Sequence, residues 1–168
     1  MKAQQGVNVG GSAPTHPFHL PFRPPIRRHV SLTITTRRAT DARMVTTLLQ
    51  VALGGAIGAS ARYLTSVATI RLVGPGFPWA TLTVNIAGSF LMGALVVVLA
   101  RESGTRFAPF LMTGILGGFT TFSAFSLDAL TIYERGQTGQ AAAYVLASVI
   151  VSLAAIVAGM ALMRGIYQ

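Results

Sequence analysis

The fold is decided by residues 113–126, with the sequence TGILGGFTTFSAFS. They lie in an apolar segment, residues 107–131, that is long enough to cross a bilayer as a helix. Its middle is a poor helix, because adjacent glycines are followed by two β-branched threonines. Lipid cannot satisfy the carbonyls that a loosened helix frees, so they must face protein or a polar cavity. The sequence therefore predicts a span broken at residues 117–121, as in transport proteins; the alternative is a glycine patch that only packs closely.

Aromatic and hydroxyl side chains follow the glycines directly. Phe122 and Phe125 are three residues apart and so share one helical face, with Ser123 and Ser126 beside them. This interleaving of rings and hydroxyls favours an ion pathway over simple close packing.

The composition identifies the class of protein. The chain has 168 residues, of which 52% are hydrophobic and 10% charged, and its mean hydropathy is +0.60. Such a chain is too apolar for an ordinary soluble domain. We expect an all-α, multi-pass protein of the cell inner (plasma) membrane, embedded in lipid. Without cysteine it has no disulfide and no thiolate chemistry.

The basic charge is concentrated at the N-terminus. Seven of the 13 Lys and Arg residues, and all three His residues, precede Met44. The high isoelectric point therefore belongs largely to a tail, and nucleic-acid binding is not favoured. Residues 1–43 are rich in Pro, Gly, Ser, Thr and Arg, which predicts a disordered basic extension. A cytoplasmic tail, a targeting segment and an upstream extension before a start at Met44 all fit; we favour a dispensable tail or the start at Met44.

Residues 44–168 are expected to form one channel domain with four spans, at about residues 45–70, 81–100, 107–131 and 140–163. Gly54, Gly58 and Ala59 in the first span would let another helix approach closely. Arg62 follows them. It either snorkels to the interface or places a positive charge at the mouth of an anion path, and the two interpretations are balanced.

Polar residues recur on one face of the second and fourth spans. Asn85 lies one turn after Thr81 and one turn before Ser89. A lone Asn is usually explained by an interhelical hydrogen bond, but a stripe favours a pathway. The fourth span carries a second stripe at spacings of four residues: Tyr144, Ser148 and Ser152.

These groups suit a small anion. The spans have no Glu, Asp, Lys or His at mid-depth, which argues against a proton-driven pump. They also have no catalytic constellation, so no enzyme is expected. Asp128 lies near a span end, where a solvated or paired interfacial charge is favoured over proton coupling. Amide and hydroxyl donors and the positive edges of phenyl rings can replace the water around an anion, while free carbonyls suit a hard cation.

Three segments carry a resemblance to a known family: residues 54–63 (GGAIGASARY), 85–93 (NIAGSFLMG) and 117–126 (GGFTTFSAFS). In this order and spacing, the chain from Met44 onward resembles the small bacterial fluoride channels, the Fluc or CrcB family. The long basic extension is not part of that pattern, and Ala124 stands where the family often has Thr or Ser.

The resemblance implies a passive channel that exports cytoplasmic fluoride and so reduces its toxicity. It implies an antiparallel, dual-topology homodimer with two pores. A structural Na⁺ at the dimer centre would be held by the backbone carbonyls of Gly117 and Thr120. Arg62 matches an arginine near the pore vestibule. The implied pore residues are Asn85, Phe122, Phe125, Tyr144, Ser148, Ser152 and Thr81.

The charges are compatible with dual topology. Without the extension, the side that holds the C-terminus has Arg101, Arg106 and Arg164, and the other side has Arg62, Arg71 and Arg135. Three against three gives no preferred orientation under the positive-inside rule.

Two other classes are weighed against a channel. A small four-span, dual-topology multidrug or cation exporter is the main alternative, but that class generally relies on a carboxylate in its first span, and residues 45–70 have none. A structural membrane protein would explain the glycines but not the aligned donors.

Overall fold

The computed structural model describes residues 28–101 and 105–168, and the side chains of residues 40–101 and 106–168. Every regular element in these ranges is helical. In chain order they are α1 (Arg28–Val73), α2 (Trp79–Arg101), the 3₁₀ turn η1 (Thr105–Phe107), the π-helix η2 (Pro109–Leu116), α3 (Gly117–Phe119), α4 (Phe122–Glu134) and α5 (Thr138–Ile166).

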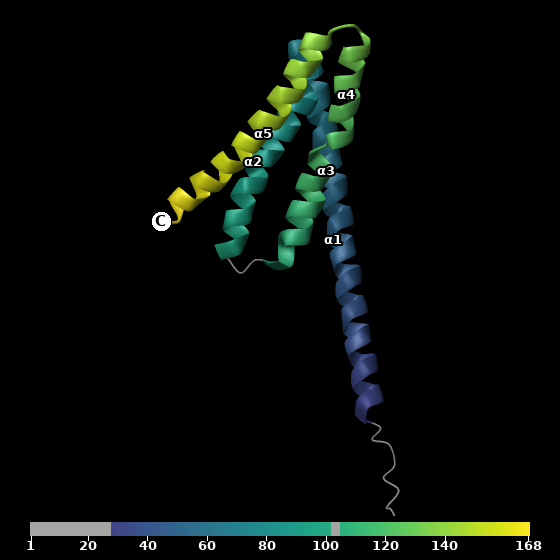
Figure 1. Cartoon of the computed structure of the whole chain (residues 1–168). Coiled ribbons are helices and arrows are strands. Elements are labelled where there is room, and N and C mark those ends of the chain that lie inside the picture. Colours follow the sequence, from purple (N-terminus) through teal and green to yellow (C-terminus); the bar gives the residue numbers. More distant parts are fainter. Residues whose placement is uncertain (1–27, 102–104) are drawn as a thin grey trace, which may run out of the picture.

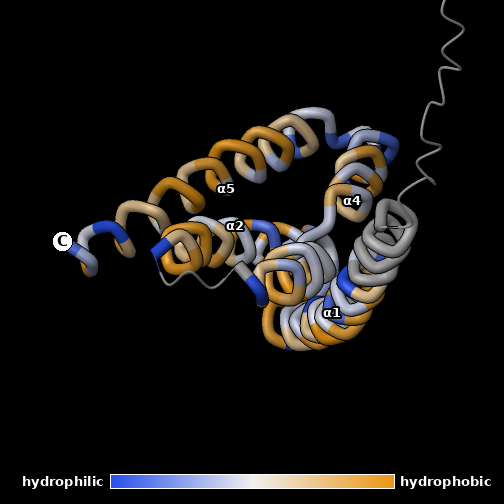
Figure 2. Tube along the Cα trace, turned by 90° about the horizontal axis from the view of Figure 1, so that it is seen from below, coloured by the Kyte–Doolittle hydropathy of each residue, from blue (hydrophilic) through white to orange (hydrophobic). Residues whose placement is uncertain are grey.

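Within the described residues, four segments are long and apolar enough to cross a membrane, as the sequence predicted. They are Thr40–Val73, Trp79–Arg101, Pro109–Glu134 and Thr138–Ile166. The third span is assembled from η2, α3 and α4, as a broken helix requires. Hydrophobic residues cover most of α5, and polar ones lie near its two ends (Figure 2).

The helices form two packed pairs. The helix α2 lies along α5, and the segment from η2 to α3 lies along α1 (Figure 1). The two pairs diverge from the end where α4 turns into α5, and α4 packs against α5 there. Gly136 makes this turn with a φ of +78°, a conformation that favours glycine.

The interruption of the third span is narrower than the five residues predicted. Only Thr120 (φ −77°, ψ 156°) and Thr121 (φ −153°, ψ 120°) are extended, whereas Gly117–Phe119 stays helical. A π-helical turn precedes the interruption: the N–H of Gly117 donates to the carbonyl of Met112, five residues back. At Gly118, close packing against the backbone of Gly55 and Ala59 in α1 offsets the low helix propensity of glycine.

Glycines bring the backbones of each pair into contact. A Cβ added to Gly118 would lie 2.7 Å from the carbonyl oxygen of Gly55, and one added to Gly58 would overlap the carbonyl oxygen of Ile115. In the other pair, Gly93 faces the backbone of Ile156 in the same way. Small residues are what allow such approach between helices in lipid.

The extension differs in part from its prediction. Residues 28–43 continue α1 without a break, whereas no regular structure was expected before Met44. The first part of α1 extends well beyond the other helices (Figure 1), and the side chains of residues 40–43 are exposed. Residues 1–27 lie outside the described residues.

Two neighbouring glycines of α1 allow a matched test of this packing. An added Cβ at Gly55 meets nothing within 4 Å, whereas at Gly58 it meets backbone atoms that cannot move aside. We expect Gly58→Ala to lower the free energy of unfolding by about 1–3 kcal/mol, the usual cost of overpacking. Gly55→Ala should cause no loss, since alanine is the better helix former. Thermal unfolding of both variants in detergent measures the difference, and equal midpoints would contradict the proposed contact.

Candidate functional site

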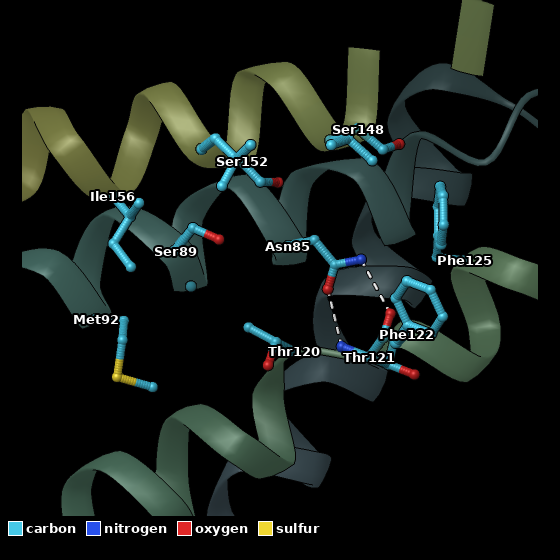
Figure 3. A pocket seen from close by; sticks show the side chains of 13 residues that line it. Asn85, Ser89, Met92, Thr120, Thr121, Phe122, Phe125, Ser148, Ser152 and Ile156 are labelled. Atoms are coloured by element: carbon cyan, nitrogen blue, oxygen red, sulfur yellow. Dashed lines mark hydrogen bonds between the residues drawn. The ribbon is translucent and has the colours of Figure 1, made fainter. Parts of the chain in front are cut away.

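A groove of about 350 Å³ lies where α2, α5 and the interruption of the third span meet (Figure 3). Two phenyl rings, Phe122 and Phe125, stand at one end and aliphatic side chains line the other. Its polar lining consists of Asn85 and Ser89 of α2, Thr120 and Thr121 of the interruption, and Ser148 and Ser152 of α5.

The amide of Asn85 clamps the interruption from α2. Its Oδ1 accepts the N–H of Thr121 at 2.8 Å, and its Nδ2 donates to the carbonyl of Thr121 at 3.0 Å (Figure 3). One side chain thus satisfies both polar groups of a residue that has left the helix. The interhelical bond that the sequence left as the alternative is therefore present. Asn85 also lines the groove, and a primary amide has a second N–H to donate.

The same bonds release two backbone carbonyls. In a continuous helix the N–H of Thr121 would donate to Gly117, and that of Ala124 would donate to Thr120. Here the first goes to Asn85 and the second to the side chain of Thr121, at 3.2 Å. The carbonyls of Gly117 and Thr120 have thus lost their helical donors. Carbonyl oxygens are ligands for hard cations, so this pair fits the Na⁺ site that the resemblance implied.

Two hydroxyls of α5 are buried in the groove without partners. The Oγ atoms of Ser148 and Ser152 are both enclosed and form no hydrogen bond with the described residues. Ser148 is only 4% exposed. Buried hydroxyls nearly always have a partner, so these two can donate to a ligand that occupies the groove.

The two phenyl rings differ sharply in exposure. Their centroids are 5.3 Å apart with 48° between the planes. Phe125 is 8% exposed, whereas Phe122 is 77% exposed. Because the ring of Phe122 is so exposed, no other part of the described chain covers the groove on that side.

A second cavity of about 340 Å³ lies beside the turn from α1 to α2, and its polar lining includes Thr81, Asp128 and Arg135. Tyr144 lies next to it, fully buried, and its hydroxyl donates to Oδ2 of Asp128 at 3.4 Å. That hydroxyl also lies near the hydroxyls of Thr81 and Ser148. Tyr144 is therefore placed between the second cavity and the groove.

Arg62 contacts the interruption from the other side. Its Nε donates to the carbonyl of Gly118 at 3.1 Å, and the residue is half-buried. The sequence suggested the interface or an anion entrance for this side chain, but did not suggest a backbone partner within the third span.

The structure brings together five of the predicted pore residues in one groove: Asn85, Phe122, Phe125, Ser148 and Ser152. Thr81 lies instead in the second cavity, and Tyr144 lies between that cavity and the groove. Asp128, favoured as an interfacial charge, is half-buried and bonded by Tyr144. Asp128 lies three residues after Phe125 and so shares its helical face, which could have indicated that Asp128 is partly buried. Sequence reasoning also missed the capping hydroxyl of Thr121, although Thr before a helix-start pattern is a recognised signal.

The metal predicted for this site depends on backbone oxygens alone. No cluster of three His, Cys, Asp or Glu side chains occurs within the described ranges. The freed carbonyls of Gly117 and Thr120 are therefore the candidate ligands.

Comparison with known proteins identifies the family. The model of the family described as CrcB-like protein, Camphor Resistance (CrcB), matches residues 49–160. The chain belongs to the CrcB family. A relative from Cereibacter sphaeroides, strain ATCC 17029, named fluoride-specific ion channel FluC, is 70% identical over 122 residues, which is 73% of this chain and 98% of the relative. Proteins of the same name from Ruegeria sp. (58% over 124 residues, 73% and 98%) and Paracoccus denitrificans (56% over 121 residues, 72% and 97%) also match.

The membership confirms three predictions. The resemblance to the CrcB fluoride channels is confirmed, as is the prediction of a multi-pass membrane protein. The prediction that the chain is not an enzyme is confirmed as well, because CrcB relatives are named as ion channels.

Proposed function

We propose that this chain is a fluoride channel through which cytoplasmic fluoride leaves the cell passively, so that its toxicity is reduced. The observation that carries the proposal is the pair of buried hydroxyls, Ser148 and Ser152, that have no partner among the described residues. They face a groove that also contains the amide of Asn85. An anion that accepts strong hydrogen bonds would satisfy these donors.

The path of the ion follows the hydroxyls of α5. We assign the entrance to the second cavity, with Thr81 on its wall and Tyr144 between it and the groove. Ser148 and Ser152 then succeed one another at one-turn spacing along α5. Each step replaces part of the water shell of the ion with protein donors. The charge of Arg62 favours an anion near the interruption, in keeping with its proposed place at the vestibule.

The phenyl rings contribute weakly positive edges. The hydrogen atoms at a ring edge attract an anion, whereas the ring face repels it. Phe122 and Phe125 are tilted by 48°, so the two rings can present edges in different directions to one ion. We propose that they complete the coordination where hydroxyl donors are absent.

Fluoride efflux from proteoliposomes tests the pore. Removing a hydrogen bond to a charged ligand costs about 1.5–3 kcal/mol, so Ser148→Ala should slow efflux by about tenfold or more. Phe122→Ile, which removes the ring edge, should also slow it. Ser126→Ala is the matched control, because the hydroxyl of Ser126 is bonded to the carbonyl of its own helix at Phe122, 2.9 Å away. Vesicles that retain fluoride with the unaltered chain would reject the channel and favour the exporter.

We propose that two copies assemble as an antiparallel homodimer. The groove of one copy is open at Phe122, and apolar side chains along α1 are exposed as well, including Leu53, Ile57 and Leu64. A second copy would cover such a surface and close the pore. The balance of arginines between the two sides allows both orientations.

A single cysteine reports the orientation, because the chain has none of its own. Gln137 lies in the exposed turn between α4 and α5, so Gln137→Cys should be tolerated. An antiparallel dimer predicts that a membrane-impermeant maleimide labels about half of the copies from outside and the remainder only after the vesicles are opened. Complete labelling from one side, or a monomer mass by light scattering in detergent, would contradict the dimer.

We propose that Na⁺ is held at the centre of the dimer by the carbonyls of Gly117 and Thr120. The ion would be structural, since it would coordinate oxygens that the interruption leaves without helical donors. In the dimer each copy would contribute the same pair of carbonyls.

Exchange of the cation tests this site without a transport measurement. A ligand that binds only the folded state raises stability with its concentration. The unfolding midpoint should therefore rise by several degrees in NaCl compared with N-methyl-D-glucamine chloride at the same ionic strength. Equal midpoints in the two salts would exclude a structural Na⁺.

A further inference from the structure

Arg62 bonds the third span through its Nε atom, which donates to the carbonyl of Gly118 at 3.1 Å. In a continuous helix that carbonyl would accept the N–H of Phe122, four residues later. The extended residues Thr120 and Thr121 separate the two groups. Arg62 therefore supplies the donor that the interruption removes from Gly118.

Glycine packing places Arg62 at this point. Arg62 lies one turn after Gly58, whose backbone is packed against Ile115 and Phe119. A Cβ on Gly118 would lie 3.2 Å from the N of Ala59. With α1 and α3 in backbone contact, the fourth side-chain atom of residue 62 reaches the Gly118 oxygen. The partner is a neutral carbonyl, so this contact does not cancel the charge that makes an arginine costly within a span.

We propose that Arg62 is a positioning residue that holds the interruption of the third span open, and that it does so through its Nε donor rather than its charge. The Gly118 carbonyl on one side is fixed from α1, and the Thr121 peptide on the other side is fixed by Asn85 from α2. The interruption is thus held between two helices that belong to different packed pairs. The consequence for transport rests on the proposed channel function; the consequence for the backbone does not.

Two variants separate the donor from the charge. In R62Q the amide nitrogen occupies the same position along the side chain as Nε, so a donor is kept and the charge is lost. In R62M the same position carries a methyl group, so both are lost with similar length. Glutamine is the less favourable of the two in a membrane, so any advantage of R62Q over R62M reports the hydrogen bond.

The measurement is amide hydrogen exchange of the full-length protein in residues 117–124, alongside fluoride efflux. We expect R62Q to retain protection close to that of the unaltered chain and R62M to exchange about tenfold faster, because R62M leaves the Gly118 carbonyl without a donor. Efflux should follow the same order. R71M is the control, since Arg71 is exposed at the end of the same helix.

Each outcome decides the proposal. Assembly of R62Q but not of R62M would also support the donor role. Equal exchange in R62Q and R62M would overturn the proposal. If both exchange fast, the charge holds the backbone; if both stay protected, neither the donor nor the charge is needed. The expected exchange pattern in a protein that moves no fluoride would leave this inference standing and reject the proposed function.

Discussion

The structure depends on the need to satisfy backbone polar groups inside a membrane. A helix that is interrupted in lipid exposes N–H and carbonyl groups to a medium without hydrogen-bond partners, each at a cost of several kcal/mol. Here side chains from two other spans take over: Asn85 bonds both polar groups of Thr121, and Arg62 bonds the carbonyl of Gly118. Asn85 and Arg62 are therefore explained first by the backbone of the third span and only then by an ion.

This requirement accounts for the glycines as well. Asn85 and Arg62 can reach the interruption only if α1 and α2 approach the third span closely. On α1 the approach is backbone to backbone at Gly55 and Gly58; on α2, Gly88 leaves room for the methyl group of Thr120. The low helix propensity of glycine suggested that the helix would break at the glycines. Gly118 is nevertheless helical, because its lack of a side chain serves close packing, and the extended backbone lies at the two threonines that follow.

Much of the fold could be predicted from the sequence, because hydrophobic length alone determines four spans and a glycine-rich interruption identifies the third. The groove was also predictable in part: hydroxyls at four-residue spacing must share a face of α5, as Ser148 and Ser152 do. Which side chains of different helices meet in space was not predictable. Thr81 shares a face of α2 with Asn85 yet lies in a different cavity, because the pairs of helices diverge and one stripe passes two separate spaces. No sequence pattern indicated that Arg62 of α1 would bond a carbonyl of α3.

The same clamp links the two ions that we propose for the site. By accepting the N–H of Thr121, Asn85 removes the donor of Gly117; by accepting the N–H of Ala124, the Thr121 side chain removes the donor of Thr120. Each of these two bonds therefore releases an oxygen suited to a cation. An anion path lined by N–H and O–H donors and a cation site built from carbonyls are complementary products of one interruption, because a peptide group that turns its N–H to a side chain leaves a carbonyl elsewhere in the helix without its donor. A chain without a carboxylate in the middle of its spans can in this way carry sites for both signs of charge within a few residues.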